Sequence, residues 1–202
     1  MSERNANRPG YKKTRVGWIP EEWEVVHLKN IANINNENLS SSTENDYEFT
    51  YISLGNINKG VIDLPVERIY YSIAPSRARR LVRRGDILLS TVRPNLKGFG
   101  YINFPVKDVV CSTGFAVLTP KNKVHGRYLY ELMFSTRAEK YFLACVVGSN
   151  YPALNNSDVE NMRIPLPPLP EQKRIAEILG TWDRAIEQTR QLIDAKQRLK
   201  KG

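Results

Sequence analysis

At 202 residues with 41% apolar side chains, the chain has room for one globular domain of about 150 residues and an additional element. Ten tyrosines, six phenylalanines and three tryptophans argue against a disordered chain. The formal net charge of +9 favours an acidic partner, namely nucleic acid, an anionic membrane or an acidic protein, over a basic surface that meets only solvent.

The first part of the chain divides into an arm and a strand-rich body. Residues 1–16 are polar and basic without a hydrophobic period, so we expect a flexible arm. From 17 to 163, short runs rich in valine, isoleucine, tyrosine and threonine alternate with turn residues, which is typical of strands. These runs are TYISLG (50–55), VERIYYS (66–72), DILLST (86–91), FGYINF (99–104) and DVVCSTGFAVLTP (108–120). Between 127 and 146, apolar residues at spacings of three and four predict helix.

The body at 17–163 is therefore predicted to be a mixed α+β domain with a mainly β middle. It is followed at 164–170 by IPLPPLP, in which four of seven residues are proline. Proline lacks a backbone N–H and pushes the preceding residue towards extended backbone, so this stretch predicts a stiff spacer. Pro170 and Glu171 suit the first turn of a helix, where a missing N–H and a negative charge are both tolerated.

Residues 171–202 are predicted to form one long amphipathic helix. Apolar residues step by seven over about four heptads, roughly 45 Å, and Gly180 does not change their phase. A helix this long cannot bury its stripe on a body that it leaves through a rigid spacer, so we expect it to pair with another helix. The alternative is a helix that folds back onto its own domain. The residues selected for the helix contact are Ile175, Ile178, Leu179, Trp182, Ile186, Leu192, Ile193 and Leu199.

Patterns typical of catalytic sites are sparse. His27 and His125 lie far apart and near no cysteine pair, so we expect no zinc site. Cys111 and Cys145 sit in apolar stretches without a CxxC spacing, which favours free thiols in a reducing cytoplasm. Glycine-rich nucleotide motifs between a strand and a helix are missing, and we expect no covalent chemistry. With no apolar h-region and no apolar run near about 18 residues, neither secretion nor a membrane span is expected.

Basic charge gathers near turn residues in segment 77–97, RARRLVRRGDILLSTVRPNLK, against the single acid Asp86. Arginine contacts phosphates and grips guanine O6 and N7 with two bonds, and asparagine pairs with adenine in the same manner. The polar loop GSNYPALNNSD (148–158) carries an aromatic residue suited to a groove or a phosphate. The alternative is a solvated basic face. The residues selected for DNA contact are Arg77, Arg79, Arg80, Arg93, Asn95, Lys97, Asn150 and Tyr151.

Taken in order, five stretches resemble the specificity subunits of type I restriction–modification enzymes. They are GWIPEEWEVVHLKNIANI, YISLGNINKG, RLVRRGDILLSTVRPNLKGFG, CSTGFAVLTP and GSNYPALNNSDVENMRIPLPPLPEQKRIAEIL. The proline-rich spacer followed by Glu-Gln and an isoleucine-rich helix is the most specific part. The resemblance covers nearly everything from Gly17 onward.

The resemblance implies a mixed α/β target-recognition domain that reads one half of a split DNA site. It also implies long helices that pair antiparallel and fix the distance between the two half-sites. A subunit of this kind has no catalysis or cofactor of its own. It docks modification subunits, which methylate adenine with S-adenosylmethionine, and through them the restriction subunits, so ATP and magnesium are expected only on partners.

One departure from the family pattern bears on assembly. Full-length members carry two recognition domains and two helices, whereas each motif occurs once here. The chain is then either a fragment or a half-subunit that forms a homodimer and reads a split palindrome. Two other functions remain open from the residues alone. They are a DNA-modifying enzyme with an unrecognised motif, and a helix-mediated assembly or inhibitor module with an incidental basic surface.

Overall fold

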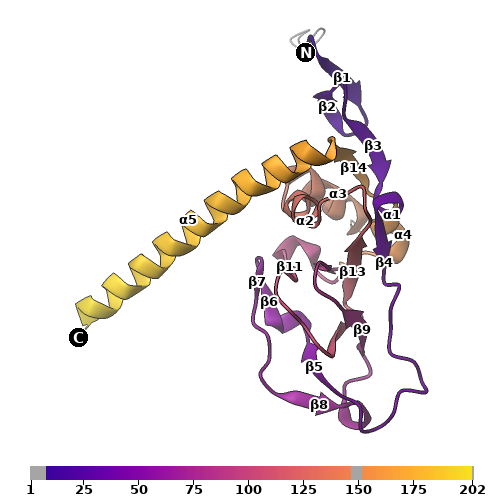
Figure 1. Ribbon diagram of the computed structural model, residues 1–202, viewed down its shortest axis with the longest axis vertical. Helices are drawn as coiled ribbons and strands as arrows, with labels where there is room; N and C mark the ends of the chain where they lie inside the picture. Colours follow the sequence, from indigo (N-terminus) through magenta and orange to yellow (C-terminus); the bar gives the residue numbers. More distant parts are fainter. Residues whose placement is uncertain (1–7, 147–151, 202) are drawn as a thin grey trace.

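The body of the protein is built from two four-stranded sheets (Figure 1). The computed structural model describes residues 8–146 and 152–201. The first sheet is antiparallel throughout and has the order β11 (Phe99–Tyr101), β10 (Ile87–Ser90), β13 (Phe115–Pro120) and β4 (Ala32–Ile34). The second contains one parallel pair, β5 with β12, and has the order β8 (Arg68–Tyr70), β5 (Glu48–Ile52), β12 (Val109–Ser112) and β9 (Ala78–Val82). The chain crosses between these two sheets after β4, β9, β11 and β12.

Smaller elements complete the fold. Three two-stranded sheets pair β1 (Tyr11–Thr14) with β2 (Gly17–Pro20), β3 (Glu24–His27) with β14 (Arg163–Leu166), and β6 (Ile57–Asn58) with β7 (Val61–Ile62). The helices are α1 (Leu28–Ile31), α2 (Gly126–Met133), α3 (Thr136–Val146), α4 (Asn156–Asn161) and α5 (Leu169–Lys201). Short 3-10 turns are η1 (Leu54–Asn56), η2 (Tyr71–Ile73) and η3 (Pro94–Leu96). The predicted α+β class, with a mainly β middle and a long last helix, is confirmed.

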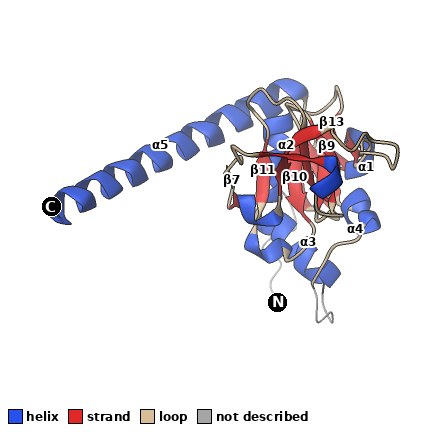
Figure 2. Ribbon diagram, turned by 90° about the horizontal axis from the view of Figure 1, so that it is seen from below, coloured by secondary structure: helices blue, strands red, loops and turns tan. Residues whose placement is uncertain are grey.

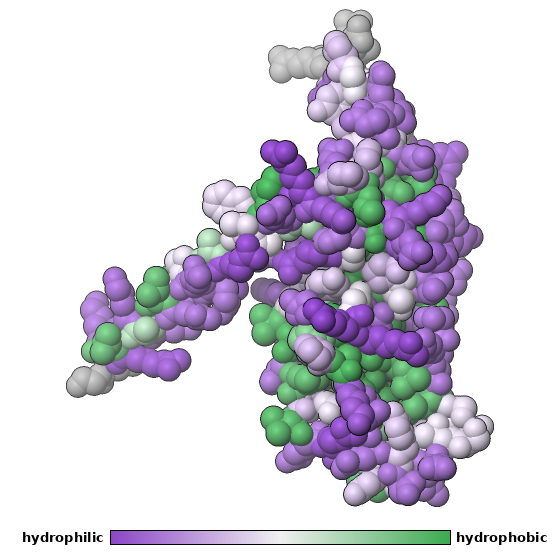
Figure 3. Space-filling view, viewed as in Figure 1, coloured by the Kyte–Doolittle hydropathy of each residue, from purple (hydrophilic) through white to green (hydrophobic). Residues whose placement is uncertain are grey.

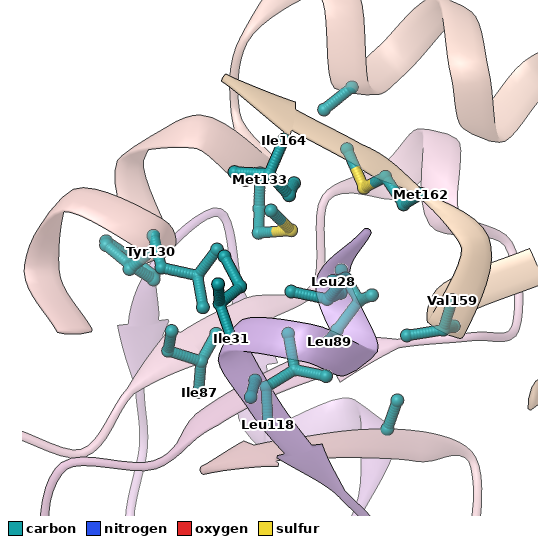
Figure 4. Packing of buried hydrophobic residues seen from close by; sticks show 14 of the residues in the cluster. Leu28, Ile31, Ile87, Leu89, Leu118, Tyr130, Met133, Val159, Met162 and Ile164 are labelled. Atoms are coloured by element: carbon teal, nitrogen blue, oxygen red, sulfur yellow. The ribbon is translucent and has the colours of Figure 1, made fainter. Parts of the chain in front are cut away.

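Strand β10 is buried on both faces and ties the packing together. Ile87 and Leu89 join Leu118 in a cluster that includes the buried side of α2 (Figure 4). Leu88 points the other way and packs with Ile102 in a second cluster. This division follows from the two-residue period of a strand. Each of these side chains stabilises the fold by about 1.5–3 kcal/mol through burial.

The helical stretch predicted between 127 and 146 is two helices, α2 and α3, instead of one. Ser135 lies in the break between them. Its Oγ donates to the carbonyl of Leu132 at 2.6 Å and accepts from the amide of Ala138 at 3.2 Å. A serine hydroxyl that binds nearby backbone groups competes with the helix ladder, which accounts for the interruption.

The segment expected to be an N-terminal arm contains a strand. Residues 11–14 pair with 17–20 in a regular antiparallel hairpin. Tyr11, Lys12 and Lys13 are exposed in this strand, so it shows none of the apolar alternation that marks a buried strand in a sequence. The hairpin therefore combines backbone pairing with the burial of Val16 in its turn and Ile19 in its second strand.

The segment expected to be a proline spacer also begins as a strand. Residues 163–166 pair antiparallel with β3, and Ile164, Pro165 and Leu166 are buried. Pro165 is tolerated because β14 belongs to a two-stranded sheet, where one side of the strand needs no partner. Its carbonyl accepts a hydrogen bond from the hydroxyl of Tyr128 at 2.8 Å. Pro165 and Pro167 thus pack into the body, whereas Pro168 and Pro170 are exposed, and Pro170 lies in the first turn of α5, as expected.

Helix α5 projects away from the body (Figures 1 and 2). Its 33 residues correspond to about 50 Å of helix. Only its first turns touch the body, and every side chain from Thr181 to Lys200 is exposed. Gly180 does not interrupt the helix, and a Cβ placed there would meet nothing within 4 Å. The helix therefore does not fold back onto its own domain. Within the described residues, none of the helices combines the length and apolar character needed to cross a membrane.

Gln172 joins the start of α5 to the body. It is 1% exposed, and its Oε1 accepts a hydrogen bond from the amide of His125 at 2.8 Å. Its Nε2 donates to the carbonyls of Lys123 at 3.2 Å and Pro167 at 2.8 Å. Next to it, the carboxylate of Glu171 accepts from Trp23 Nε1 at 3.0 Å. One buried amide thus connects α5 with the loop before α2 and with the proline stretch.

We predict that Gln172→Ala lowers the free energy of unfolding by about 2–3 kcal/mol, because it leaves buried backbone groups without partners. The matched control is Gln188→Ala on the exposed part of the same helix, which should change stability by less than about 0.5 kcal/mol. Urea unfolding of both variants measures the difference. Equal, small effects would show that the junction is not held by this amide.

Candidate nucleic-acid interface

Four segments that are distant in sequence meet at one edge of the body, which we call the loop edge (residues 75–77, 91–97, 112–114 and 152–157). The amide of Thr113 donates to the carbonyl of Arg77 at 2.8 Å. The carbonyl of Gly114 accepts from both the amide and the hydroxyl of Thr91, each at 2.9 Å. Two residues after Thr91, the amide of Arg93 donates to the carbonyl of Pro152 at 2.8 Å. Backbone hydrogen bonds therefore connect the entry to β9, the loop after β10, the turn between β12 and β13, and the segment before α4.

Two arginines at the loop edge are free to bind a ligand. Arg77 and Arg93 are both exposed. In the ranges that the structure describes, neither forms an ion pair. Their guanidinium groups can therefore bind phosphate or a base edge without first breaking an internal contact.

The loop around η3 holds a strained backbone. Arg93 has φ 49° and Lys97 has φ 54°, so both adopt the left-handed conformation that costs a side-chain-bearing residue about 1–2 kcal/mol. Two contacts stabilise the strained conformation. They are the backbone hydrogen bond from Arg93 to Pro152 and an ion pair between Lys97 Nζ and Glu139 at 3.0 Å. Between these two residues, Asn95 and Leu96 stand exposed at the tip of the turn. Strain of this kind persists where the surroundings over-determine it, and such places are often functional sites.

Arg79 and Arg80 point to opposite sides of β9 and are both engaged within the body. The guanidinium of Arg79 lies 5.1 Å from the ring centre of Tyr71. That of Arg80 donates to the Asn35 side chain and to the carbonyl of Phe115. Burial lowers the pKa of the Arg80 guanidinium. Both of these arginines therefore support the strand beside the loop edge through internal contacts.

Asn35 is a central residue of this region that sequence reasoning missed. Its Oδ1 accepts from the amide of Val117 at 2.8 Å and from Arg80. Its Nδ2 donates to Asn156 Oδ1 at 3.2 Å, which lies on the loop edge. With φ 56°, Asn35 adopts the left-handed conformation that asparagine tolerates better than most residues. The Asn-Asn pair at 35–36 was a turn signal, but it carried no sign of these distant partners.

The remaining residues selected for DNA contact are accounted for as follows. Arg77, Arg93 and Asn95 come together at the loop edge, and Lys97 lies there with its ammonium paired to Glu139. Asn150 and Tyr151 lie outside the described residues.

The residues selected for the helix contact form an unpaired stripe. Ile175 is partly buried against the body, where α5 begins. Figure 3 shows apolar residues spaced along the projecting part of α5 among polar ones. The exposed members are Ile178 at 51%, Leu179 at 39%, Trp182 at 66%, Ile186 at 48%, Leu192 at 64%, Ile193 at 49% and Leu199 at 83%. Soluble helices rarely leave so long an apolar stripe in water, which indicates a partner surface.

The last ion pair between α5 and the body lies within the length of the stripe. Arg127 on α2 forms ion pairs with Asp183 on α5 and, from Nε at 2.6 Å, with Glu131. Burial raises the pKa of the Glu131 carboxyl, while Arg127 opposes that shift. Asp183 is therefore the last residue of α5 in an ion pair with the body, and beyond it Ile186, Glu187 and Arg190 face residues 59–61 across an open groove.

The described residues offer few groups suited to covalent chemistry. No cluster of three His, Cys, Asp or Glu side chains that could hold a metal ion occurs among them. Cys111 and Cys145 are both free thiols. Burial raises the pKa of the Cys111 thiol to about 12, so this sulfur stays protonated and is a poor nucleophile near neutral pH.

We predict that Arg80→Met destabilises the protein by about 2–3 kcal/mol, because Asn35 and Phe115 lose a charged donor. Arg77→Met is the matched control, since Arg77 is exposed and should change stability by less than about 0.5 kcal/mol. Guanidinium chloride unfolding measures both. If the two variants unfold at the same denaturant concentration, Arg80 does not have the supporting role assigned to it.

Comparison with known proteins places this geometry in one family. The family model described as "Type I restriction modification DNA specificity domain" matches residues 20–195. Among curated proteins, the MjaIX specificity subunit of Methanocaldococcus jannaschii is 28% identical over 193 residues, covering 88% of this chain and 41% of that protein. The HindI specificity subunit of Haemophilus influenzae is 27% identical over 121 residues, or 58% of this chain and 26% of that protein.

Solved structures agree with the sequence relatives. The HsdS subunit from Thermoanaerobacter tengcongensis superposes with a TM-score of 0.72 at 28% identity, covering 86% of this chain and 45% of that one. A chain from a structural study of "complex assembly" in the type I R-M system gives a TM-score of 0.75 at 29% identity, with the same coverage. The chain thus spans less than half the length of these relatives. The chain belongs to the type I restriction modification DNA specificity domain family.

Proposed function

We propose that this chain is a non-catalytic specificity subunit that reads one half of a split DNA site within a type I restriction–modification complex. The observation that carries the proposal is the loop edge, where Arg77 and Arg93 are exposed, have no ion-pair partner among the described residues, and Arg93 begins a strained turn. The family membership supports a role in DNA recognition. It does not favour the two alternatives considered from the sequence, an enzyme with an unrecognised motif and an assembly module with incidental charge.

The chemistry of the loop edge suits direct reading of bases. Arg77 and Arg93 can bind phosphates or grip guanine O6 and N7, and Asn95 can pair with adenine N6 and N7. The exposed Leu96 offers an apolar contact for a thymine methyl group. The strained turn at 93–97 is fixed by the contacts of Arg93 with Pro152 and of Lys97 with Glu139. These groups are therefore presented with little loss of conformational entropy on binding.

The other selected residues take two roles in this proposal. Asn150 and Tyr151 remain candidates for DNA contact. Arg79, Arg80 and Lys97 hold the reading surface in shape, since their charged groups already have partners in the body. We divide the chain accordingly into an N-terminal segment at 1–16, a recognition domain at 17–163, a junction at 164–170 and a spacing helix at 171–202.

We further propose that α5 pairs antiparallel with α5 of a second copy. Such a homodimer places two identical loop edges about a two-fold axis, so the target is a split palindrome. The exposed stripe of α5 and the length of the relatives, about twice that of this chain, support this arrangement. Modification subunits, and restriction subunits through them, are the proposed partners, and S-adenosylmethionine, ATP and magnesium are assigned to them. The proposed compartment is the cytoplasm.

For DNA binding, we predict that Arg77→Glu combined with Arg93→Glu weakens binding to a 30-base-pair duplex at least tenfold. The dependence of log affinity on log salt should become shallower by about 2, because two phosphate or base contacts are lost. Fluorescence anisotropy across a salt series gives both quantities.

The matched control for DNA binding is Arg84→Glu combined with Lys107→Glu. Both residues are exposed, and Arg84 lies beyond the far end of β9, whose five residues span about 17 Å. This variant carries the same change in net charge and should bind DNA within about twofold of the original. Equal losses in the two double variants would mean that net charge, and not the loop edge, determines binding.

For assembly, we predict that the purified chain is a dimer of about twice 23.2 kDa and that Ile186→Asp makes it a monomer. A buried, unpaired carboxylate in a helix contact costs several kcal/mol. Gln191→Asp, on the side of α5 opposite the stripe, should leave the dimer intact. Light scattering across a concentration series measures the mass. A strict monomer before any substitution would rule out self-pairing.

A further inference from the structure

Two adjoining cavities form a cleft between the β1–β2 hairpin, α3 and β14. The larger has a volume of about 390 Å³ and the smaller about 250 Å³. Arg137, Met162 and Arg163 line both, so the two lie side by side. We call this the arginine cleft. None of its lining residues belongs to the loop edge.

The floor of the arginine cleft is apolar. Leu132, Ile164 and Ile175 line the larger cavity together with Tyr128 and Trp23. The polar atoms of the two aromatic residues are already used, because the Tyr128 hydroxyl donates to Pro165 at 2.8 Å and Trp23 Nε1 donates to Glu171 at 3.0 Å. The floor therefore presents mainly carbon to a ligand.

The rim is cationic. Arg15 comes from the turn of the hairpin, Arg137 from the first turn of α3, and Arg163 from the start of β14. Across residues 8–146 and 152–201, none of these three guanidinium groups has an ion-pair or hydrogen-bond partner. By contrast, Arg68 and Arg127 each pair with two acids.

The position of the hairpin brings these charges together. Gly17, with φ +97°, begins β2 directly after the hairpin turn, and a Cβ there would lie 3.4 Å from Arg137 Nη2. The hairpin thus packs close to the guanidinium of α3 without supplying a carboxylate. Like charges around one hollow repel one another, and an anionic group placed between them removes that cost.

The combination of floor and rim identifies the kind of ligand. A DNA backbone offers phosphates but no apolar group that fills a cavity of this size. A segment of protein chain can offer both, with carboxylates for bidentate contacts to arginine and a large side chain as a buried anchor. We propose that the arginine cleft docks an acidic segment of a partner protein, with an aromatic or aliphatic side chain in the hollow. This inference does not depend on the DNA-reading role of the loop edge.

The experiment uses the full chain as bait for a displayed library of random 12-residue peptides, with the variant Arg137→Glu combined with Arg163→Glu for counter-selection. Enriched peptides are expected to carry aspartate or glutamate next to phenylalanine, tryptophan, leucine or isoleucine. One enriched peptide is then labelled and its affinity measured by fluorescence anisotropy. This peptide should bind the variant at least tenfold more weakly than it binds the original chain. The same peptide with its acids changed to amides should bind the original chain at least tenfold more weakly than the acidic peptide does.

Two controls keep the result specific. Arg84→Glu combined with Lys107→Glu carries the same charge change outside the cleft and should bind the peptide within about twofold of the original. Arg137→Gln combined with Arg163→Gln should also lose the peptide, and an unchanged thermal unfolding midpoint shows that it is folded. The proposal is overturned if no acidic peptides are enriched, or if both charge variants bind them equally. It is also overturned if duplex DNA displaces the peptide and loses affinity when Arg137 and Arg163 are changed.

Discussion

The buried amide of Gln172 fixes how the long helix leaves the body, and the rest of the arrangement depends on that junction. Its three hydrogen bonds connect the first turn of α5 to the loop before α2 and to the proline stretch. Trp23 donates a hydrogen bond to Glu171, and Arg127 forms an ion pair with Asp183 about three turns further along α5. A helix of about 50 Å magnifies any change of angle at its base. Only a stiff junction allows such a helix to set a distance between two reading surfaces.

The basic segment at 77–97 contains both arginines with internal partners and arginines that are exposed to solvent. Arg79 and Arg80 are held by Tyr71, Asn35 and Phe115, whereas Arg77 and Arg93 reach into solvent. A DNA-reading surface needs both kinds of arginine. Under the proposed function, the arginines with internal partners keep the strand and loops in one conformation, and the two exposed arginines are presented to DNA already arranged.

Features encoded by local pattern could be predicted from the sequence. The heptad stripe of α5 and the apolar runs of β10, β12 and β13 depend on residues a few positions apart, and these elements formed where expected. Proline was a less reliable guide, because Pro165 lies in a buried strand of a two-stranded sheet and not in an exposed spacer. The hairpin at 11–20 escaped notice since the side chains of its first strand are exposed and mostly polar, although Val16 and Ile19 are buried.

Features that depend on distant partners could not be predicted. The partners of Arg80 lie 45 and 35 residues away, and those of Asn35 reach 121 residues along the chain. Composition cannot distinguish an arginine that has partners within the body from one that is exposed to solvent. The basic segment was therefore interpreted as a single DNA-binding cluster. The arginine cleft was invisible for the same reason, because Arg15, Arg137 and Arg163 meet only once the hairpin, α3 and β14 have packed together.

Selection of bound duplexes from a random-sequence DNA pool tests the central claim most directly, because it examines the loop edge and the pairing of α5 together. The purified chain is used, and the variant with Arg77 and Arg93 both changed to glutamate is carried through in parallel. The account predicts enriched duplexes with two inverted copies of one short motif at a constant spacing, and no such enrichment by the variant. A single undivided motif would contradict self-pairing through α5, and enrichment of the same motif by the variant would contradict reading by the loop edge.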